Sequence, residues 1–301
     1  MTETSNPTRT TIKPTRIHIL PDDVKSWLMA LPLVAVLAFF LILPIIMIVI
    51  VSFWGATEFS IYPAFKLENY QYMFGSPVTY SVFLKTFIYA ITTWFFTLAI
   101  GFTVAYFLAF HVRTLTWQVT LFLVCTIPFW TSNIIRMISW IPFLGRNGIA
   151  NTALINMGVI DAPLDWLLFS DFAVVLAFVH LYTLFMVVPI FNTMMRIDGA
   201  LIEAARDAGA SGLQILLNII IPLAKPGIMI GSIFVVTLVM GDFITVRIMS
   251  GSQSANVGRL ISNDIGLLQY PSGSATAVVL LLTVLITIGI MLRFVDIRKE
   301  L

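Results

Sequence analysis

The stretch Glu203-Ala204-Ala205-Arg206-Asp207-Ala208-Gly209, followed by Ile219-Ile220-Ile221-Pro222, lies between the fourth and fifth long apolar segments of the chain. An amphipathic helix resting on a bilayer is one interpretation of such a stretch, but a composition rich in Leu and Lys would suit that role better. Small residues instead allow a partner surface to approach closely, and Glu203 offers it a charged contact. The stretch therefore predicts a protein-docking loop between two membrane spans.

The same loop carries local signals for two short helices. Asp198 can cap the first helix, and Gly209 is a natural left-handed residue at its C-terminal end. Ser211 can open the second helix, where Gln214 completes a capping box. Because proline cannot continue a helix easily, we expect Pro222 and Pro226 to end the element before the fifth span begins. The loop as a whole covers about residues 197–226.

Composition indicates that the chain is a membrane protein. Hydrophobic residues make up 59% and charged residues 11%, whereas a soluble domain carries about 25% charged residues. Crossing about 30 Å of hydrocarbon takes about 20 apolar residues. The first apolar segment, residues 27–53, is too long for the hydrophobic core of a signal peptide, so we expect it to remain as a membrane anchor. The six predicted spans are residues 27–53, 86–110, 119–142, 172–195, 227–247 and 275–292.

Basic residues predict the orientation of these spans. With the N-terminus in the cytoplasm, eleven Lys and Arg residues of the connections fall inside, against three outside, Lys66, Arg146 and Arg259. This excess satisfies the positive-inside rule and places both termini in the cytoplasm. Residues 1–26 then form a cytoplasmic N-terminal tail, and the loop at 197–226 also faces the cytoplasm. Residues 54–84, outside, are rich in Tyr and Phe and are expected to be ordered.

The spacing in the loop resembles the EAA loop of permease subunits from binding-protein-dependent, type I ABC importers. That pattern is Glu-Ala-Ala, three residues, Gly, nine residues and Ile-x-Leu-Pro, and only the Leu differs here, being Ile221. The resemblance implies an all-α, six-helix permease domain over residues 27–301. It also implies that the loop docks on a cytoplasmic ATPase through six residues, namely Glu203, Ala204, Ala205, Gly209, Ile219 and Pro222.

The same resemblance implies partners and a location. Such a permease pairs with a second, homologous permease, rests on a dimer of ATPase subunits and receives solute from an extracytoplasmic substrate-binding protein. ATP would be bound by the partner ATPase, so no cofactor is expected in this chain. The implied location is the bacterial cytoplasmic, or inner, membrane, where the chain would be a multi-pass protein surrounded by lipid.

A second resemblance concerns the solute. The stretches 128–136 (Pro-Phe-Trp-Thr-Ser-Asn-Ile-Ile-Arg) and 201–211 are similar to the first permease of spermidine/putrescine importers. The similarity runs through most of the chain from about residue 65 onward. A polyamine or related amine is therefore the implied solute. Permeases for opines, aminophosphonates and iron share much of this pattern and stay open as alternatives.

Charged side chains within the spans are candidates for the translocation path. Arg136 and Asp242 each cost about 2.5–3.5 kcal/mol on insertion scales unless they are paired or face water. If both spans are straight, Arg136 and Asp242 lie at similar depths, roughly 25 and 23 Å from the cytoplasmic ends of their spans. An ion pair between them and a role in the translocation path are both open. Trp130, Thr131 and Asn133 complete the candidate set. His180 is expected to form an interhelical hydrogen bond.

Backbone signals predict how the spans pack. Gly227 and Gly231 form a GxxxG pattern, which favours close approach of another helix. Pro44, Pro128, Pro142 and Pro189 are expected to break or kink their spans.

Enzymatic motifs are absent from the sequence. It contains no GxxxxGK[ST] phosphate-binding loop, no HExxH, no GxSxG and only one cysteine, Cys125, so neither catalysis nor a metal site is expected. The charge of +2 is too small to suggest nucleic-acid binding. An ion-coupled carrier, a passive channel and an intramembrane enzyme remain the alternatives of a different class, and transport that requires ATP would separate the importer from all three.

Overall fold

The computed structural model describes residues 22–57, 60–112 and 114–293. Most of the predicted N-terminal tail, residues 1–26, lies outside them. The described chain is helical apart from one two-stranded hairpin, and it divides into two units, up to Met47 and from Ile48 onward. Five described helices are long and apolar enough to cross a membrane, and a bent pair gives a sixth if it makes one span.

The first unit is a membrane-length helix interrupted by a π turn. It consists of α1 (Asp22–Leu37), η1 (Ala38–Ile42) and the start of α2 (Leu43–Val51). The N–H of Leu43 donates to the carbonyl of Ala38, five residues earlier. Pro44 has no N–H and cannot make the usual helical hydrogen bond. The wider turn beside it lets the helix continue without that bond. The irregularity predicted at Pro44 is therefore a π turn.

The second unit opens with a short ordered segment. Strand β1 (Gly55–Ala56) pairs antiparallel with β2 (Ile61–Tyr62), and α3 (Glu68–Gly75) follows. The amide of Asn69 donates to the carbonyls of Ser52 and Trp54, both at 2.9 Å. These bonds fold the segment back on the helix end, which confirms the predicted order for the described residues of 54–84, namely 54–57 and 60–84.

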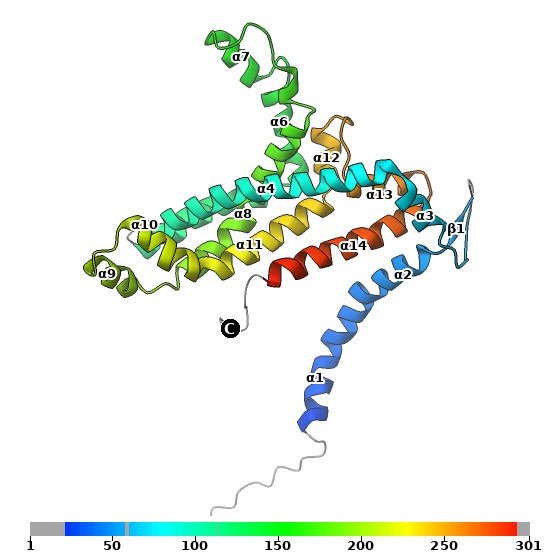
Figure 1. Cartoon of the computed structure of the whole chain (residues 1–301), viewed down its shortest axis with the longest axis horizontal. Helices are drawn as coiled ribbons and strands as arrows, with labels where there is room; N and C mark the ends of the chain where they lie inside the picture. Colours follow the sequence, from blue (N-terminus) through cyan, green and yellow to red (C-terminus); the bar gives the residue numbers. More distant parts are fainter. Residues whose placement is uncertain (1–21, 58–59, 113, 294–301) are drawn as a thin grey trace, which may run out of the picture. The chain divides into compact units, whose positions relative to one another are not determined.

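Three long helices of the second unit form its core (Figure 1). They are α4 (Pro77–Phe110), α8 (Asp171–Met194) and α11 (Ile221–Gly241), and each packs against the other two. Side chains of α8, such as Phe178, Met186 and Ile190, are fully buried between them. Of the break or kink expected at Pro189, the break is not formed, because α8 is continuous through this residue.

Glycines let α11 approach α8 closely. A Cβ on Gly227 would lie 2.5 Å from the carbonyl oxygen of Pro189, and one on Gly231 would lie 2.8 Å from Sδ of Met186. Both contacts are shorter than ordinary van der Waals contact. The GxxxG prediction is thus confirmed as a contact between these two helices.

Replacing Gly227 by Ala is expected to destabilise this contact by about 1–3 kcal/mol, because the obstructing atom belongs to the backbone and cannot rotate away. Gly289→Ala is the matched control, since nothing lies within 4 Å of its Cβ position in a membrane helix. The measurement is the thermal unfolding midpoint in detergent. Equal midpoints for the two variants would contradict the packing described above.

The predicted third span is not one helix. Helix α5 (Leu115–Thr126) leads into the 3-10 turn η2 (Ile127–Trp130), and α6 (Asn133–Leu144) then departs at 87°. Thr131, between them, has extended backbone angles. The break follows Pro128, as expected of proline, whereas Pro142 remains within α6. Helix α7 (Ile149–Asn156) and the turn η3 (Asp165–Leu167) follow.

The fifth predicted span is also corrected. The helix that begins with α10 (Gly212–Ile215) and η4 (Leu216–Ile220) continues into α11 and ends at Gly241, not at residue 247. Separate helices α12 (Ile244–Met249) and α13 (Val257–Gly266) follow before α14 (Tyr270–Arg293). Asp242 therefore lies just after a helix end rather than inside a span. The fourth and sixth predictions agree with α8 and α14, although α14 begins five residues early.

Candidate functional site: a coupling element and a polar cavity

The docking loop has the predicted local structure. The side chain of Asp198 accepts from the N–H of Ala200 at 2.9 Å and caps α9 (Gly199–Asp207). Gly209 follows α9 with φ of +83°, the left-handed conformation. Ser211 and Gln214 form a complete capping box at the start of α10. These contacts are local in sequence, and they fix the angle between the two short helices.

A groove lies between the two short helices of the loop. Its volume is about 420 Å³, and its lining includes Ala205, Gly209 and Ile219 of the predicted coupling set. Glu203, Ala204 and Pro222 are exposed but do not line it. Its residues are small or aliphatic, apart from Gln214 and Asn218. A partner side chain can enter because no large side chain closes the groove.

The structure overturns the predicted end of the loop. Helix continues through Pro222 and Pro226 into α11 instead of stopping at them. The π turn η4 precedes Pro222. A π turn shifts the register of the backbone hydrogen bonds by one residue, so the helix tolerates the N–H that Pro222 lacks. The second short helix of the loop and the core helix α11 are thus one continuous helix from Gly212 to Gly241.

Asp242 lies at a second cavity. This cavity has a volume of about 340 Å³, and Asn133, Tyr182, Thr237 and Asp242 are its polar lining. The Tyr182 hydroxyl donates to Oδ2 of Asp242 at 2.6 Å, and the N–H of Thr245 donates to Oδ1 at 3.0 Å. The Thr245 hydroxyl also donates to Oδ2. The carboxylate is held by neutral donors, so its negative charge is not cancelled.

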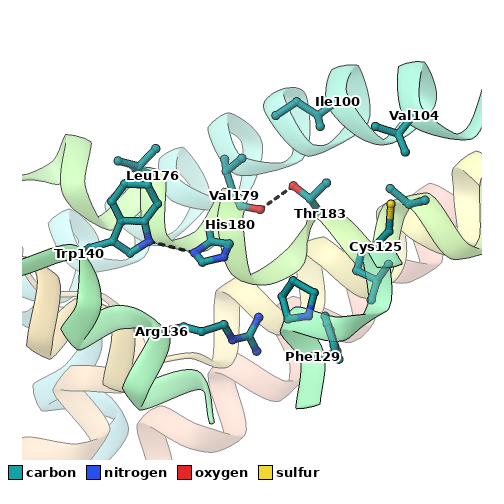
Figure 2. A pocket seen from close by; sticks show the side chains of 13 residues that line it. Ile100, Val104, Cys125, Phe129, Arg136, Trp140, Leu176, Val179, His180 and Thr183 are labelled. Atoms are coloured by element: carbon teal, nitrogen blue, oxygen red, sulfur yellow. Dashed lines mark hydrogen bonds between the residues drawn. The ribbon is translucent and has the colours of Figure 1, made fainter. Parts of the chain in front are cut away.

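Arg136 does not pair with Asp242. No ion pair joins them among the described residues, and the guanidinium of Arg136 instead donates to the amide oxygen of Asn133. Its carbon lies 5.3 Å from the centre of the Phe129 ring. The similar depths inferred from the sequence assumed straight spans, whereas the third span bends by 87° before it reaches Arg136. Arg136 lines a different cavity, with Trp140 and His180 (Figure 2).

The remaining candidates of the translocation path are more peripheral. Trp130 is 85% exposed within this chain, and the Thr131 hydroxyl donates to the carbonyl of Pro128 at 2.8 Å. Neither residue lines the cavity of Asp242, whereas Asn133 does. The Nε1–H of Trp140 donates to Nδ1 of His180 at 2.9 Å, which confirms the predicted interhelical bond of that histidine.

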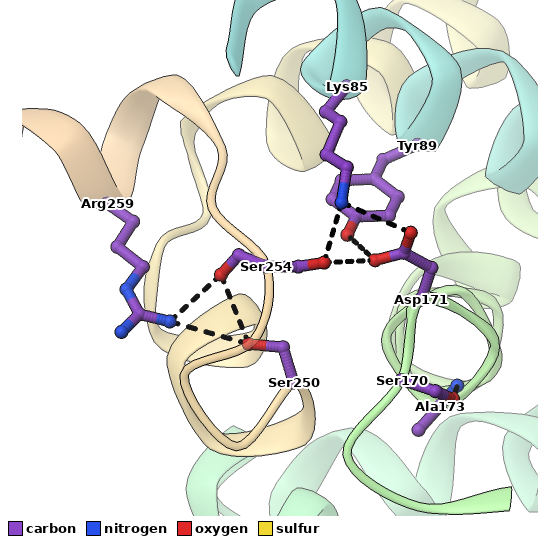
Figure 3. A network of polar contacts seen from close by, with 8 residues as sticks. All are labelled: Lys85, Tyr89, Ser170, Asp171, Ala173, Ser250, Ser254 and Arg259. Atoms are coloured by element: carbon purple, nitrogen blue, oxygen red, sulfur yellow. Dashed lines mark hydrogen bonds and ion pairs between the residues drawn. The ribbon is translucent and has the colours of Figure 1, made fainter. Parts of the chain in front are cut away.

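A polar network at the opposite end of the bundle from the loop was missed in the sequence (Figure 3). Asp171, at the start of α8, accepts from the Tyr89 hydroxyl at 2.5 Å, from Ser254 and from Lys85 at 3.3 Å. The Lys85 ammonium also donates to Ser254 at 2.8 Å. The network ties α4 and α8 to the segment between α12 and α13. The sequence does contain one signal for this network. Tyr89 lies in a long apolar segment, and a buried tyrosine hydroxyl usually needs a hydrogen-bond partner.

Curated relatives decide the family. The spermidine/putrescine transport system permease protein PotB of Escherichia coli K12 is 34% identical over 269 residues, which are 88% of this chain and 94% of PotB. The chain belongs to the PotB family of permeases. PotB of Haemophilus influenzae is 33% identical over 245 residues, which are 80% of this chain and 84% of that protein. No family model matches the chain.

More distant relatives agree with the PotB assignment. The inner membrane ABC transporter permease YdcU of Escherichia coli K12 is 26% identical over 217 residues, covering 69% of this chain and 68% of YdcU. Among solved structures, a chain of a bacterial alginate ABC transporter has a TM-score of 0.70 and 15% identity, covering 89% of this chain and 93% of its own. At 15% identity, the similarity to the alginate transporter chain shows the fold alone.

Membership of the PotB family fixes the general role. The chain is a permease subunit of an ABC importer, a transport component rather than a catalytic one. It is a multi-pass protein of the bacterial inner membrane, in agreement with its five or six membrane-length helices.

Proposed function

We propose that this permease forms part of the path for a polyamine and that Asp242 receives one ammonium group of the solute. The observation that carries the proposal is the carboxylate of Asp242, which lines a 340 Å³ cavity with only neutral hydrogen-bond donors around it. A cation that leaves water loses its hydration, and a carboxylate offsets that loss. PotB relatives named for spermidine and putrescine support the same solute class.

A second feature of this cavity supports a ligand. The Thr237 hydroxyl is buried and has no hydrogen-bond partner within the described chain, and Thr237 lines the cavity beside Asp242. A buried hydroxyl without a partner costs free energy. An ammonium group can donate to both the Thr237 oxygen and the Asp242 carboxylate. The Asn133 amide oxygen already accepts from Arg136, so Asp242 and Thr237 are the acceptors that this cavity offers to an ammonium group.

The partners are part of the proposal. A second, homologous permease completes the path, and a dimer of ATPase subunits docks on the groove around Ala205, Gly209 and Ile219. ATP is bound by that dimer and not by this chain. An extracytoplasmic binding protein delivers the solute, and both termini lie in the cytoplasm together with the loop. Closure of the ATPase dimer pulls the loop, and the continuous rod of α10, η4 and α11 carries that motion to Asp242.

Uptake into proteoliposomes tests this function. The chain is reconstituted with the subunits encoded beside it and with the binding protein, and uptake of labelled putrescine is followed with and without ATP. We expect uptake to require ATP and to be competed by unlabelled spermidine. Stronger competition by an opine, an aminophosphonate or ferric iron would contradict the polyamine. Uptake that proceeds equally without ATP would contradict the importer and favour an ion-coupled carrier.

A further inference from the structure

A third cavity lies apart from the cavity of Asp242, between α4, α5, α6 and α8 (Figure 2). Its volume is about 380 Å³. Most of its wall is apolar, and α4 and α8 contribute aliphatic side chains such as Ile100, Val104 and Val187. A mainly apolar pocket of a few hundred Å³ with a small number of polar groups is typical of sites for small molecules.

Arg136 is the one permanent charge in this wall. The residue is 7% exposed, and its Nε has no hydrogen-bond partner among the residues that the structure describes. Its other contacts in the described chain are the Asn133 amide oxygen and the face of the Phe129 ring. The lining of the cavity contains no Asp or Glu. A buried guanidinium without a carboxylate is costly unless another anion compensates it.

His180 supplies a second donor beside Arg136. Its Nδ1 accepts from the indole N–H of Trp140 at 2.9 Å. A nitrogen that accepts carries no proton, so the proton of the neutral ring is on Nε2. His180 lines the same cavity as Arg136, from α8 rather than α6 (Figure 2). The polar end of the cavity thus holds a positive charge and donors, and it repels an ammonium group.

We propose that this cavity binds an anionic amphiphile. A carboxylate or phosphate group accepts from Arg136 and from Nε2 of His180, and an apolar chain lies along Ile100, Val104 and Val187. A guanidinium with a free Nε–H suits an oxyanion because it can donate in a fork. The site is separate from the cavity of Asp242, so a cationic solute and this anion occupy different places. Occupancy holds α6 against α8, the two helices that carry Arg136 and His180.

Decanoate is the probe, with decanol as a neutral molecule of the same chain length. The full chain is placed in nanodiscs of phosphatidylcholine, and saturation binding of labelled decanoate is measured after subtraction of empty discs. We expect saturable binding that is stronger for decanoate than for decanol. Arg136→Gln should weaken decanoate binding by about ten-fold, since charge-assisted hydrogen bonds are lost. Decanol binding should not change.

Two further variants make the result decisive. Thr183→Val changes a neutral side chain in the same wall. The Thr183 hydroxyl donates to the carbonyl of Val179 at 2.6 Å and is not available to the anion, so this variant should bind decanoate as the unmodified chain does. Arg136→Lys keeps the positive charge and should retain most of the binding. Equal binding of decanoate and decanol by the unmodified chain would overturn the proposal even if Arg136→Gln does not assemble. Equal decanoate binding in the unmodified chain and a folded Arg136→Gln would overturn it as well.

A competition experiment distinguishes a membrane phospholipid from a single-chain amphiphile as the bound anion. Phosphatidylglycerol is added to the discs as a competitor. Displacement of decanoate by this lipid, lost in Arg136→Gln, assigns the site to a membrane phospholipid. Decanoate binding that phosphatidylglycerol leaves unchanged assigns it to a single-chain amphiphile. Both outcomes support the anion site and differ only in its occupant.

Discussion

Replacing Gly209 by Leu is expected to reduce ATP-driven uptake about ten-fold while the chain still inserts into the membrane. Gly209 has φ of +83° between α9 and α10. A residue with a Cβ loses about 1–2 kcal/mol in this conformation, which is roughly a ten-fold loss in the population of the turn. Nothing lies within 4 Å of the Cβ position, so the change strains the backbone without a steric clash in the bundle. The Leu side chain also enters the groove that this residue lines.

Gly209→Asn is the matched control, because Asn tolerates the left-handed conformation far better than Leu. Co-purification of the ATPase and uptake of putrescine are measured for both variants. We expect about a ten-fold loss of uptake for Gly209→Leu and a smaller loss for Gly209→Asn. Normal co-purification and uptake in Gly209→Leu would rule out docking through this turn.

Local structure was predictable wherever the determining contacts are close in sequence. The caps at Asp198 and Ser211 and the left-handed Gly209 were predicted because each involves residues no more than a few positions apart. Composition predicted the membrane spans, because every backbone group in hydrocarbon must be satisfied within a helix. The Gly227 contact was also predictable, since two glycines on one face leave room for a neighbouring backbone.

Other features depend on geometry that a sequence pattern does not contain. The chain changes direction by 87° between α5 and α6, which a residue count along a straight span does not contain. Of the two roles left open for Arg136, the ion pair with Asp242 is not formed among the described residues, and Arg136 donates to Asn133 instead. The helix through Pro222 depends on a π turn that no residue type marks. Tyr182 was missed as a partner of Asp242 because it is brought to the site from α8, far away in sequence. Thr245 was missed because residues 227–247 were predicted as one span, whereas the helix ends at Gly241 and Thr245 lies in the next helix.

Replacing Asp242 by Asn is expected to reduce polyamine uptake by at least about ten-fold, because the carboxylate no longer offsets the hydration that an ammonium group loses. Assembly should survive, since Asn is similar in shape. Its amide oxygen can still accept from the N–H of Thr245, and its NH2 group, at the place of Oδ2, can donate to the hydroxyl oxygens of Tyr182 and Thr245. Basal ATP hydrolysis should stay near the value of the unmodified complex. Asp161→Asn is the matched control, because Asp161 is exposed in the segment between α7 and η3 and this change removes the same charge outside the cavity.

A purely structural role of Asp242 makes a different prediction. The carboxylate accepts bonds from α8 and from α12, so its loss would then loosen the bundle and lower the yield of assembled complex. Yield and elution volume in gel filtration separate the two roles before any transport is measured. A variant that assembles poorly counts against a direct contact with the solute.

The most direct measurement is the initial rate of ATP-dependent putrescine uptake by proteoliposomes that hold equal amounts of assembled complex with Asp242, Asp242→Asn or Asp161→Asn. The polyamine path predicts a rate at least about ten-fold lower for Asp242→Asn alone, with unchanged basal ATP hydrolysis. Equal rates in all three preparations would contradict it.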